Sequence, residues 1–466
     1  MYAFRVNEVQ VDTSEEFARH RDAIDPLRGF RERFEFPKLR RTGLETGATN
    51  DPARLEAGGP WQVVYLAGNS LGLMPKSVRE IVSEELEDWA RLAVDAHFDA
   101  HRPWYSYHEI FRDAGARLVG ANPGAHPDCP EVVMMNSLTI NLHLMLMTFY
   151  RPAKDRYRIL IESHCFPSDL YAVQSHVRAR GVELGGRDAR APQTAVLEIS
   201  PRPGEHTIRE EDIEELLARE GHSIAVVLLP GVNFFTGQAF DIERITRAAH
   251  AQGCIAGWDL AHAAGNLTLR LHDWNADFAV WCSYKYLNAG PGAVAGCFVN
   301  EKHGKNLDLP RFAGWWGNDP AKRFNMLEER EFVPRAGADG WQISNPPIMS
   351  MAPLKASLDI FDEATMPALR AKSMELTGYL RALLEPEESP AAERDFKIIT
   401  PWEQDRHGCQ LSILVRDRPR ERYEALLKAG IMCDFRAPNI IRAAPAPLYN
   451  SFHDCWTFAQ VFHSLL

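Results

Sequence analysis

The stretch FAVWCSYKYLNAGPGAVAGCFV, residues Phe278 to Val299, places a single lysine between two strongly apolar runs. The first run leads to Lys285, and a glycine-rich turn then connects it to the second run. Continuous apolar runs of this kind are typical of strands that are buried on both faces of a sheet. Because an unpaired ammonium group is costly in such a place, we expect this lysine to have a chemical task.

Strand and helix patterns alternate on the N-terminal side of this stretch. The apolar runs predict strands at residues 157–163, 223–231, 254–262 and 277–285. Between them, a helix is expected to begin after Asp241 as its N-cap and to end at Gly253. Alternating strands and helices predict an α/β fold, with a mostly parallel sheet covered by helices.

The 466 residues are enough for two domains. We expect a large α/β domain over residues 61–343 and a small α+β domain over residues 344–466. Residues 1–60 contain one or two amphipathic helix patterns and a polar loop, and we expect this segment to join the small domain.

Composition excludes several classes of partner. The net charge is −11 and no dense Lys/Arg tract is present, which argues against nucleic acid. No apolar run approaches the roughly 18 residues of a membrane helix, and the N-terminus lacks an apolar signal core, so we expect no membrane partner. The eight cysteines are scattered without a Cys-x-x-Cys pair, which favours reduced thiols, a cytoplasmic location and no metal site.

Two of the expected strands end in polar residues. The end of one contains Asp259 and His262, and the end of the other contains Ser283, Tyr284 and Lys285. Ligands bind at the carboxyl ends of strands in open α/β sheets, so these side chains are expected to face one pocket. A structural ion pair between Asp259 and Lys285 is one interpretation. The other is a lysine whose pKa is lowered by burial, which forms a Schiff base with pyridoxal phosphate while the aspartate pairs with the ring nitrogen.

Two further segments suit a cofactor that carries a phosphate and a flat ring. NSLTINLHLMLMTFY, residues 136–150, predicts a buried helix whose N-terminus faces an anion, with Ser137 or Thr139 adding a hydroxyl. Phe166 and Asp169 follow the first strand, where an aromatic ring can stack on a cofactor. Simple helix capping and turn formation remain alternative interpretations of both segments.

The blocks SLTINLH, FPSD, GWDLAHAAGN, WCSYKYLNAGPG, GWWG, ISNPP and IRAAPAPLYNSFHD occur in this order along nearly the whole chain. Together they resemble the pyridoxal-phosphate enzymes of the aspartate aminotransferase fold, fold type I, and specifically the kynureninase family. The resemblance implies a homodimer that binds pyridoxal 5'-phosphate. It also implies hydrolysis of L-kynurenine or 3-hydroxy-L-kynurenine to L-alanine and anthranilate or 3-hydroxyanthranilate, a step in tryptophan catabolism and NAD biosynthesis.

The resemblance also implies a role for individual residues. Lys285 matches the Schiff-base lysine, Asp259 the partner of the ring nitrogen, and Tyr284 a phosphate contact and proton donor whose pKa a nearby cation lowers. The other cofactor positions are Leu138, Thr139, Phe166, Asp169, His262, Trp315 and Asn345, of which the last two reach the neighbouring subunit's site in this family. The substrate positions are Ser70, His97, Asn345 and Arg442, and Arg442 grips the substrate carboxylate.

One position departs from the family pattern, because Pro230 stands where some relatives have a serine on the cofactor phosphate. The resemblance also matches His97, Ser344 and Asn345 to polar positions that face the substrate ring in relatives preferring 3-hydroxykynurenine. Since a ring hydroxyl needs a hydrogen-bond partner, we expect 3-hydroxykynurenine to be preferred over kynurenine. Three other functions stay open. A cysteine desulfurase-like lyase needs a reactive thiol, for which Cys165 is the candidate. A nicotinamide-binding protein needs a GxGxxG unit that we do not find. A non-catalytic binding protein needs neither Lys285 nor Arg442.

Overall fold

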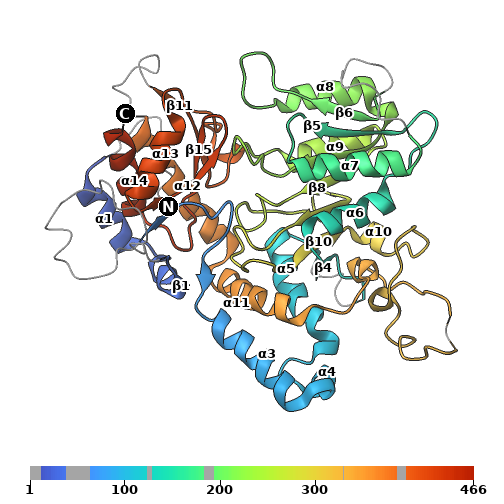
Figure 1. Cartoon of the computed structure of the whole chain (residues 1–466). Coiled ribbons are helices and arrows are strands. Elements are labelled where there is room, and N and C mark those ends of the chain that lie inside the picture. Colours follow the sequence, from blue (N-terminus) through green and yellow to red (C-terminus); the bar gives the residue numbers. More distant parts are fainter. Residues whose placement is uncertain are drawn as a thin grey trace.

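The computed structural model describes residues 12–37, 63–122, 128–182, 194–328, 330–385 and 395–465. The described chain forms a larger part built on one sheet and a smaller part that contains the C-terminal helices and strands (Figure 1). In these residues, no helix is long and apolar enough to cross a membrane. Much of the predicted N-terminal segment 1–60 lies outside the described residues.

The larger part contains a seven-stranded sheet that is mostly parallel, as predicted. Its strand order is β4 (Val132–Met135), β10 (Ala295–Val299), β9 (Phe278–Trp281), β8 (Ile255–Asp259), β7 (Ile224–Pro230), β5 (Arg158–Glu162) and β6 (Val196–Ile199). Strands β5 to β9 pair in parallel, whereas β10 runs antiparallel to both of its neighbours. The prediction of an α/β fold is confirmed.

Helices cover both faces of this sheet. Helices α6 (Leu138–Phe149) and α7 (Pro167–Ala179) pack on one face, and α5 (Arg112–Val119), α8 (Glu210–Glu220) and α9 (Ile242–Ala251) pack on the other (Figure 1). The expected helix after Asp241 is confirmed, since the Asp241 side chain accepts a hydrogen bond from the Arg244 N–H at 2.9 Å. Gly253 follows this helix with a φ of +72°, which glycine adopts without strain.

The smaller part is built on a four-stranded antiparallel sheet. Its order is β11 (Phe396–Ile398), β12 (Leu411–Val415), β15 (Ile440–Ala443) and β14 (Asp434–Arg436). Its helices are α12 (Met366–Leu384), α13 (Pro419–Lys428) and α14 (Phe452–Ser464), and the N-terminal α1 (Glu15–Ile24) packs beside α14. Trp456 Nε1 also donates to the Thr13 carbonyl at 3.1 Å, which ties this N-terminal segment to α14.

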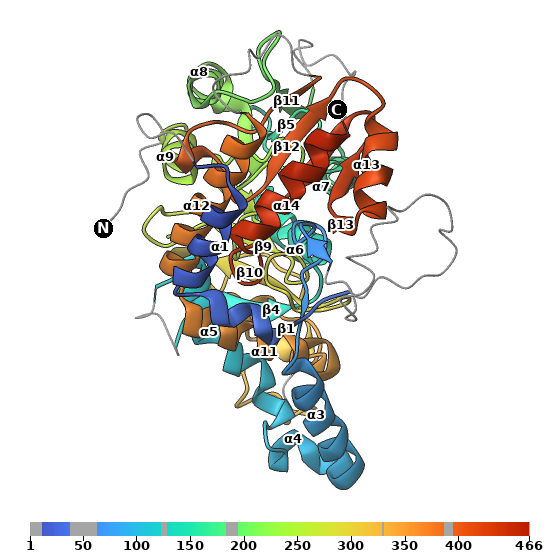
Figure 2. The same ribbon diagram turned by 90° about the vertical axis from the view of Figure 1, so that its left-hand side faces the viewer.

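Short elements and one long helix connect the two parts. Strand β2 (Val64–Tyr65) pairs with β13 (Ile431–Met432), and β1 (Phe34–Glu35) pairs with β3 (Met74–Pro75). Helix α11 (Ile348–Ala364) packs against α3 (Val78–Leu92) and α5, while α3 and α4 (Ala96–Asp99) project from the molecule (Figure 2). The remaining elements are α10 (Glu301–Gly304) and 3-10 turns, including η3 (Trp104–Phe111). The domain boundaries at residues 60 and 343 stay a prediction.

Two strands are shorter than predicted. Strand β8 ends at Asp259, before His262, and β9 ends at Trp281, before Lys285. Beyond these ends, local hydrogen bonds take the place of the hydrogen bonds between strands. The Asp259 carboxylate accepts from the Ala261 N–H at 2.7 Å, and the Ser283 carbonyl accepts from the Ala289 N–H at 3.0 Å. His262 and Lys285 therefore lie on loops at the carboxyl edge of the sheet.

Candidate active site

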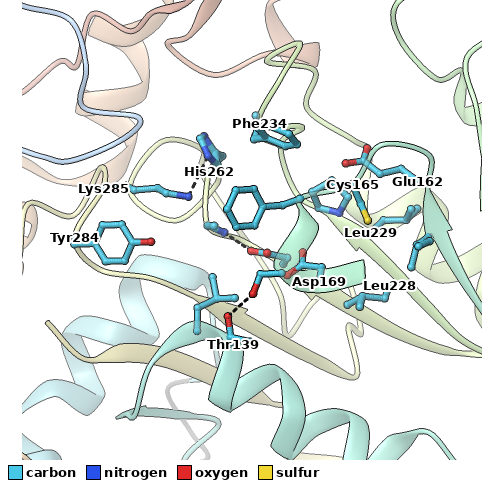
Figure 3. A pocket seen from close by; sticks show the side chains of 18 residues that line it. Thr139, Glu162, Cys165, Asp169, Leu228, Leu229, Phe234, His262, Tyr284 and Lys285 are labelled. Atoms are coloured by element: carbon cyan, nitrogen blue, oxygen red, sulfur yellow. Dashed lines mark hydrogen bonds between the residues drawn. The ribbon is translucent and has the colours of Figure 1, made fainter. Parts of the chain in front are cut away.

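A pocket opens at this edge of the sheet, lined by the ends of β5, β7 and β8 and by the starts of α6 and α7 (Figure 3). It brings together eight of the residues that the sequence predicted for a cofactor: Leu138, Thr139, Phe166, Asp169, Asp259, His262, Tyr284 and Lys285. It also contains residues that the sequence analysis had not placed there as cofactor ligands: Ile161, Glu162, Cys165, Ser168, Leu228, Leu229, Pro230, Val232, Phe234 and Ala261.

The Lys285 amine points into this pocket. Its Nζ lies 3.1 Å from His262 Nε2 and 5.8 Å from the centroid of the Phe166 ring (Figure 3). Burial and the charges of Lys285, Arg442 and Arg436 hold the pKa of His262 well below its usual range, so this imidazole is neutral. Its Nδ1 is buried and has no hydrogen-bond partner among the described residues.

Three buried carboxyl groups also line the pocket, those of Glu162, Asp169 and Asp259. Burial raises the pKa of Asp169 well above its usual range, and the neighbouring Asp259 charge and a hydrogen bond with that side chain raise it further. Burial likewise raises the pKa of Glu162 to about 8, partly offset by a hydrogen bond from Asn233. The raised pKa favours the protonated form of Asp169 next to Asp259, while Asp169 Oδ1 has no partner among the described residues.

One end of the pocket suits an anion. Helices α6 and α7 both begin here, and the hydroxyls of Thr139 and Ser168 lie 2.8 Å apart (Figure 3). Ser137 precedes α6 but makes no side-chain cap, so the first N–H groups of this helix stay available. Ser168 was missed as a ligand although it stands inside the quoted FPSD block, where its helix-start position was a usable signal.

Arg442 and Ser70 meet beside the pocket. The Arg442 side chain is 1% exposed and donates from Nη1 to the carbonyl of Phe234, a pocket residue, at 2.5 Å. Its Nη2 lies 3.3 Å from the Ser70 hydroxyl and also donates to the Asp434 carboxylate. Arg442 Nε has no partner among the described residues, so its N–H is free to donate to a further carboxylate.

Besides Arg442 and Ser70, which lie next to the pocket, three further predicted residues do not line the pocket of this chain. Trp315 is 40% exposed, and its Nε1 donates to the Arg323 carbonyl at 2.9 Å. Asn345 is exposed, and the His97 ring packs on Trp104 with centroids 5.7 Å apart. The sequence placed these residues in a site by resemblance, and one chain alone does not bring them to Lys285.

Tyr284 also lines the pocket, and its ring centroid is 5.9 Å from Lys285 Nζ. The expectation that a nearby cation lowers its pKa is wrong for the described residues. Burial raises the pKa of Tyr284, and the neighbouring Cys282 and Asp259 raise it further. The phenol therefore holds its proton at neutral pH and can donate it.

Cys165, the thiol that a cysteine desulfurase-like lyase would need, also lines this pocket. Burial raises the pKa of Cys165 well above that of an exposed cysteine, and the charges of Asp169 and Glu162 raise it further. The reactive form of cysteine is the thiolate. Cys165 therefore lacks the environment of a nucleophile.

Comparison with known proteins identifies the class to which this fold and pocket belong. Residues 64–397 match the family model described as aminotransferase class-V, and residues 369–462 match the kynureninase C-terminal domain. A solved cysteine desulfurase from Thermococcus onnurineus superposes with a TM-score of 0.66 at 17% identity, covering 86% of this chain and 94% of that one. The protein is a member of the pyridoxal-phosphate enzymes of aminotransferase class V.

Full-length relatives identify the family within this class. The chain is 53% identical to a kynureninase of Myxococcus xanthus, over 96% of each chain. It is 50% identical to a kynureninase of Koribacter versatilis, over 97% of each chain. The chain belongs to the kynureninase family.

The pocket fits the cofactor of this class, pyridoxal 5'-phosphate. Two buried polar atoms without partners, His262 Nδ1 and Asp169 Oδ1, lie in or beside a space that Lys285 and Phe166 also line. The hydroxyls and helix starts at the anion end suit a phosphate, and the carboxyl pair suits a protonated ring nitrogen.

Proposed function

We infer that this enzyme is a kynureninase, which cleaves L-kynurenine and 3-hydroxy-L-kynurenine with water to L-alanine and the corresponding anthranilate. The observation that supports this best is the buried Arg442, with an unpartnered Nε, beside a pocket that contains Lys285. An amino-acid substrate requires a group that binds its carboxylate close to an amine that reacts with the cofactor, and we assign these roles to Arg442 and Lys285. The reaction belongs to tryptophan breakdown and to NAD biosynthesis, and the eight free cysteines favour a cytoplasmic location.

The side chains take different parts in this reaction. When bound, the cofactor supplies an aldehyde that bonds to amines and a ring that accepts electron density from the substrate Cα. Asp259, supported by the Asp169 proton, holds the proton of the ring nitrogen. Lys285 takes the proton from Cα, Tyr284 returns a proton to the alanine fragment, and Arg442 and Ser70 orient the carboxylate.

The direct test is product formation by the cofactor-loaded enzyme. We expect chromatography to find L-alanine and anthranilate in equal amounts from L-kynurenine, and 3-hydroxyanthranilate from the hydroxylated substrate. We expect kcat/KM to be higher for 3-hydroxykynurenine, because His97, Ser344 and Asn345 supply polar groups for its hydroxyl. Release of sulfide from cysteine, without cleavage of kynurenine, would instead make the protein a desulfurase-like lyase.

The carboxylate grip gives a prediction for Arg442. Arg442→Lys keeps the positive charge but loses the planar guanidinium, and with it the unpartnered Nε–H that we assign to the substrate carboxylate. One hydrogen bond to a charged group contributes about 1.5–3 kcal/mol, so KM is expected to rise roughly 10- to 100-fold with a smaller change in kcat. Arg420→Lys, at a 64% exposed side chain on α13 that pairs with Glu424, is the matched control and should leave KM within about twofold. An unchanged KM in Arg442→Lys would contradict this role.

We also propose a homodimer in which Trp315 and Asn345 enter the pocket of the neighbouring subunit. The support is their exposure in one chain and the other exposed aromatics around Trp315. Phe324 is 54% exposed and packs edge-on against Trp315, and Phe98 is 60% exposed and stacks on Tyr105. Exposed apolar patches of this kind mark interaction surfaces.

Subunit mixing tests this arrangement. Lys285→Ala and Trp315→Ala are each expected to be weakly active alone, and their mixture to regain activity after subunit exchange. Half of randomly mixed dimers are hybrids with one intact site each, so about one quarter of the wild-type activity is expected. A mixture no more active than its components, with exchange verified by mass spectrometry, would place Trp315 in its own chain's site or outside any site.

A further inference from the structure

Glu162, the last residue of β5, is a buried acid in the pocket that the proposed reaction leaves without a task. It is 2% exposed, and its Oε2 accepts a hydrogen bond from Asn233 Nδ2 at 2.9 Å. Three titratable groups interact electrostatically with Glu162, and all three are acidic: Asp259, Asp169 and Cys165. No cation pairs with Glu162 in the described part of the chain. A buried carboxyl group in such surroundings is favoured in its neutral, protonated form.

Asn233, the partner of Glu162, controls the shape of the turn that follows it. Its Oδ1 accepts hydrogen bonds from the Phe235 N–H at 2.9 Å, the Thr236 N–H at 2.8 Å and the Thr236 hydroxyl at 3.0 Å. Its backbone N–H also donates to the Gln238 carbonyl at 2.7 Å. Both polar ends of this one amide are therefore used, one on the pocket acid and the other on the turn.

This turn presents its carbonyl groups to the smaller part of the protein. The Phe234 carbonyl accepts from Arg442 Nη1 at 2.5 Å and from Gln410 Nε2 at 3.1 Å. The next two carbonyls, of Phe235 and Thr236, accept from the hydroxyls of Ser412 at 2.7 Å and Thr400 at 2.6 Å. A shift of the turn therefore moves the acceptor that fixes the Arg442 guanidinium.

We propose that Glu162 and Asn233 are positioning residues, which tie the floor of the cofactor pocket to the guanidinium of Arg442 and so set its grip on the substrate carboxylate. Glu162 acts in this chain as a neutral hydrogen-bonding acid. Asn233 holds the turn in place and so fixes the position of the Phe234 carbonyl. That carbonyl accepts a hydrogen bond from Arg442 and orients its guanidinium. The inference rests on the proposed function, because it assumes that Arg442 binds the carboxylate of an amino-acid substrate.

Three variants separate this role from a general loss of structure. Asn233→Ala and Glu162→Ala are expected to raise KM for kynurenine roughly tenfold with kcat changed less than about threefold, since Arg442 loses alignment but the reacting groups remain. Glu162→Gln has the shape of the protonated acid and is expected to stay within about twofold of the wild-type KM. If Glu162→Gln is as impaired as Glu162→Ala, or if Asn233→Ala leaves KM unchanged, the proposal is wrong.

A binding measurement gives a readout that does not depend on turnover. We expect the dissociation constant for L-alanine, followed by the change in cofactor absorbance of the loaded enzyme, to rise in Asn233→Ala by about the same factor as KM. The absorbance of that variant without ligand should match the wild type, because Asn233 does not line the pocket. A changed absorbance together with an unchanged dissociation constant would assign Asn233 to the cofactor instead.

The pH dependence of stability tests the neutral acid without any substrate. Since burial raises the pKa of Glu162 to about 8, the folded state keeps a proton that the unfolded state releases above its own pKa of about 4.3. Wild-type stability should therefore fall between pH 5 and pH 8 relative to Glu162→Gln. The Tm advantage of Glu162→Gln is expected to grow over this range, whereas Glu198→Gln, at an exposed site on the neighbouring β6, should show no such trend.

These two kinds of measurement fail independently. If the enzyme does not cleave kynurenine, the proposed function is wrong, but the Tm comparison still reports whether Glu162 is a neutral acid. If the enzyme does cleave kynurenine and the Tm advantage of Glu162→Gln is constant from pH 5 to pH 8, the function stands and the role of Glu162 is wrong.

Discussion

Replacing Lys285 with alanine is expected to lower kcat for kynurenine by at least about 10³-fold. The amine whose Nζ lies 3.1 Å from His262 would be lost, and with it the base that takes the Cα proton. A positioned general base alone contributes about 10²–10⁴-fold. The visible absorbance that the cofactor shows when bonded to a lysine should disappear in the same variant, which a spectrum of the purified protein checks.

Lys305→Ala is the matched control for this experiment. The Lys305 side chain is 62% exposed and pairs with Glu301 at 3.2 Å, far from any role in the pocket. Its removal should leave both kcat and the absorbance unchanged. If Lys285→Ala keeps its kcat, Lys285 is not the reactive amine, whatever the fold and its relatives imply.

Replacing Tyr284 with phenylalanine is expected to lower kcat by about 10²–10⁴-fold while KM changes little, because the phenol donates a proton after substrate has bound. Loss of one hydroxyl from a residue that is 36% exposed should not disturb folding, so Tm should stay close to the wild-type value. Steady-state kinetics at saturating substrate check the prediction. A variant with normal kcat would assign the proton donor to another group or to water.

The pH profile of the wild-type enzyme gives a second test of Tyr284. Because burial raises the pKa of Tyr284 above its usual value near 10, the donor stays protonated throughout the neutral range. Activity should therefore not fall through ionisation of this group at any pH below 10. A loss of kcat near pH 8 that is absent in Tyr284→Phe would mean that the phenol ionises earlier, as a nearby cation would cause.

Much of the fold could be predicted from the sequence because the signals are local. The apolar runs marked β5, β7, β8 and β9, and Asp241 and Gly253 marked the ends of α9. The sequence predicted strands that end at His262 and Lys285, but both strands end earlier in the chain. The prediction was too long because apolar residues continue past the last hydrogen bond between strands. Apolar patterning does not reveal where a side chain such as Asp259 captures a backbone N–H and ends the strand.

The site was predictable where family blocks fall at the carboxyl edge of the sheet, as they do for Asp259 at the end of β8 and for Lys285 on the loop after β9. Glu162 ends β5 in the same way, but an acid after an apolar run gives no sign of whether it faces solvent or a pocket. Asn233 and Asp434 were missed because their partners, Glu162 and Arg442, come from other elements. The pKa of Tyr284 was predicted in the wrong direction, since its burial depends on the whole fold.

The most direct test of the central claim is one absorbance measurement on the wild-type enzyme loaded with pyridoxal phosphate. The spectrum is recorded before and after addition of L-kynurenine, and the products are then separated. We predict a visible band that changes at once on mixing, followed by loss of kynurenine and formation of anthranilate and L-alanine in equal amounts. A band that is unaffected by kynurenine, with the substrate recovered intact, would contradict the account.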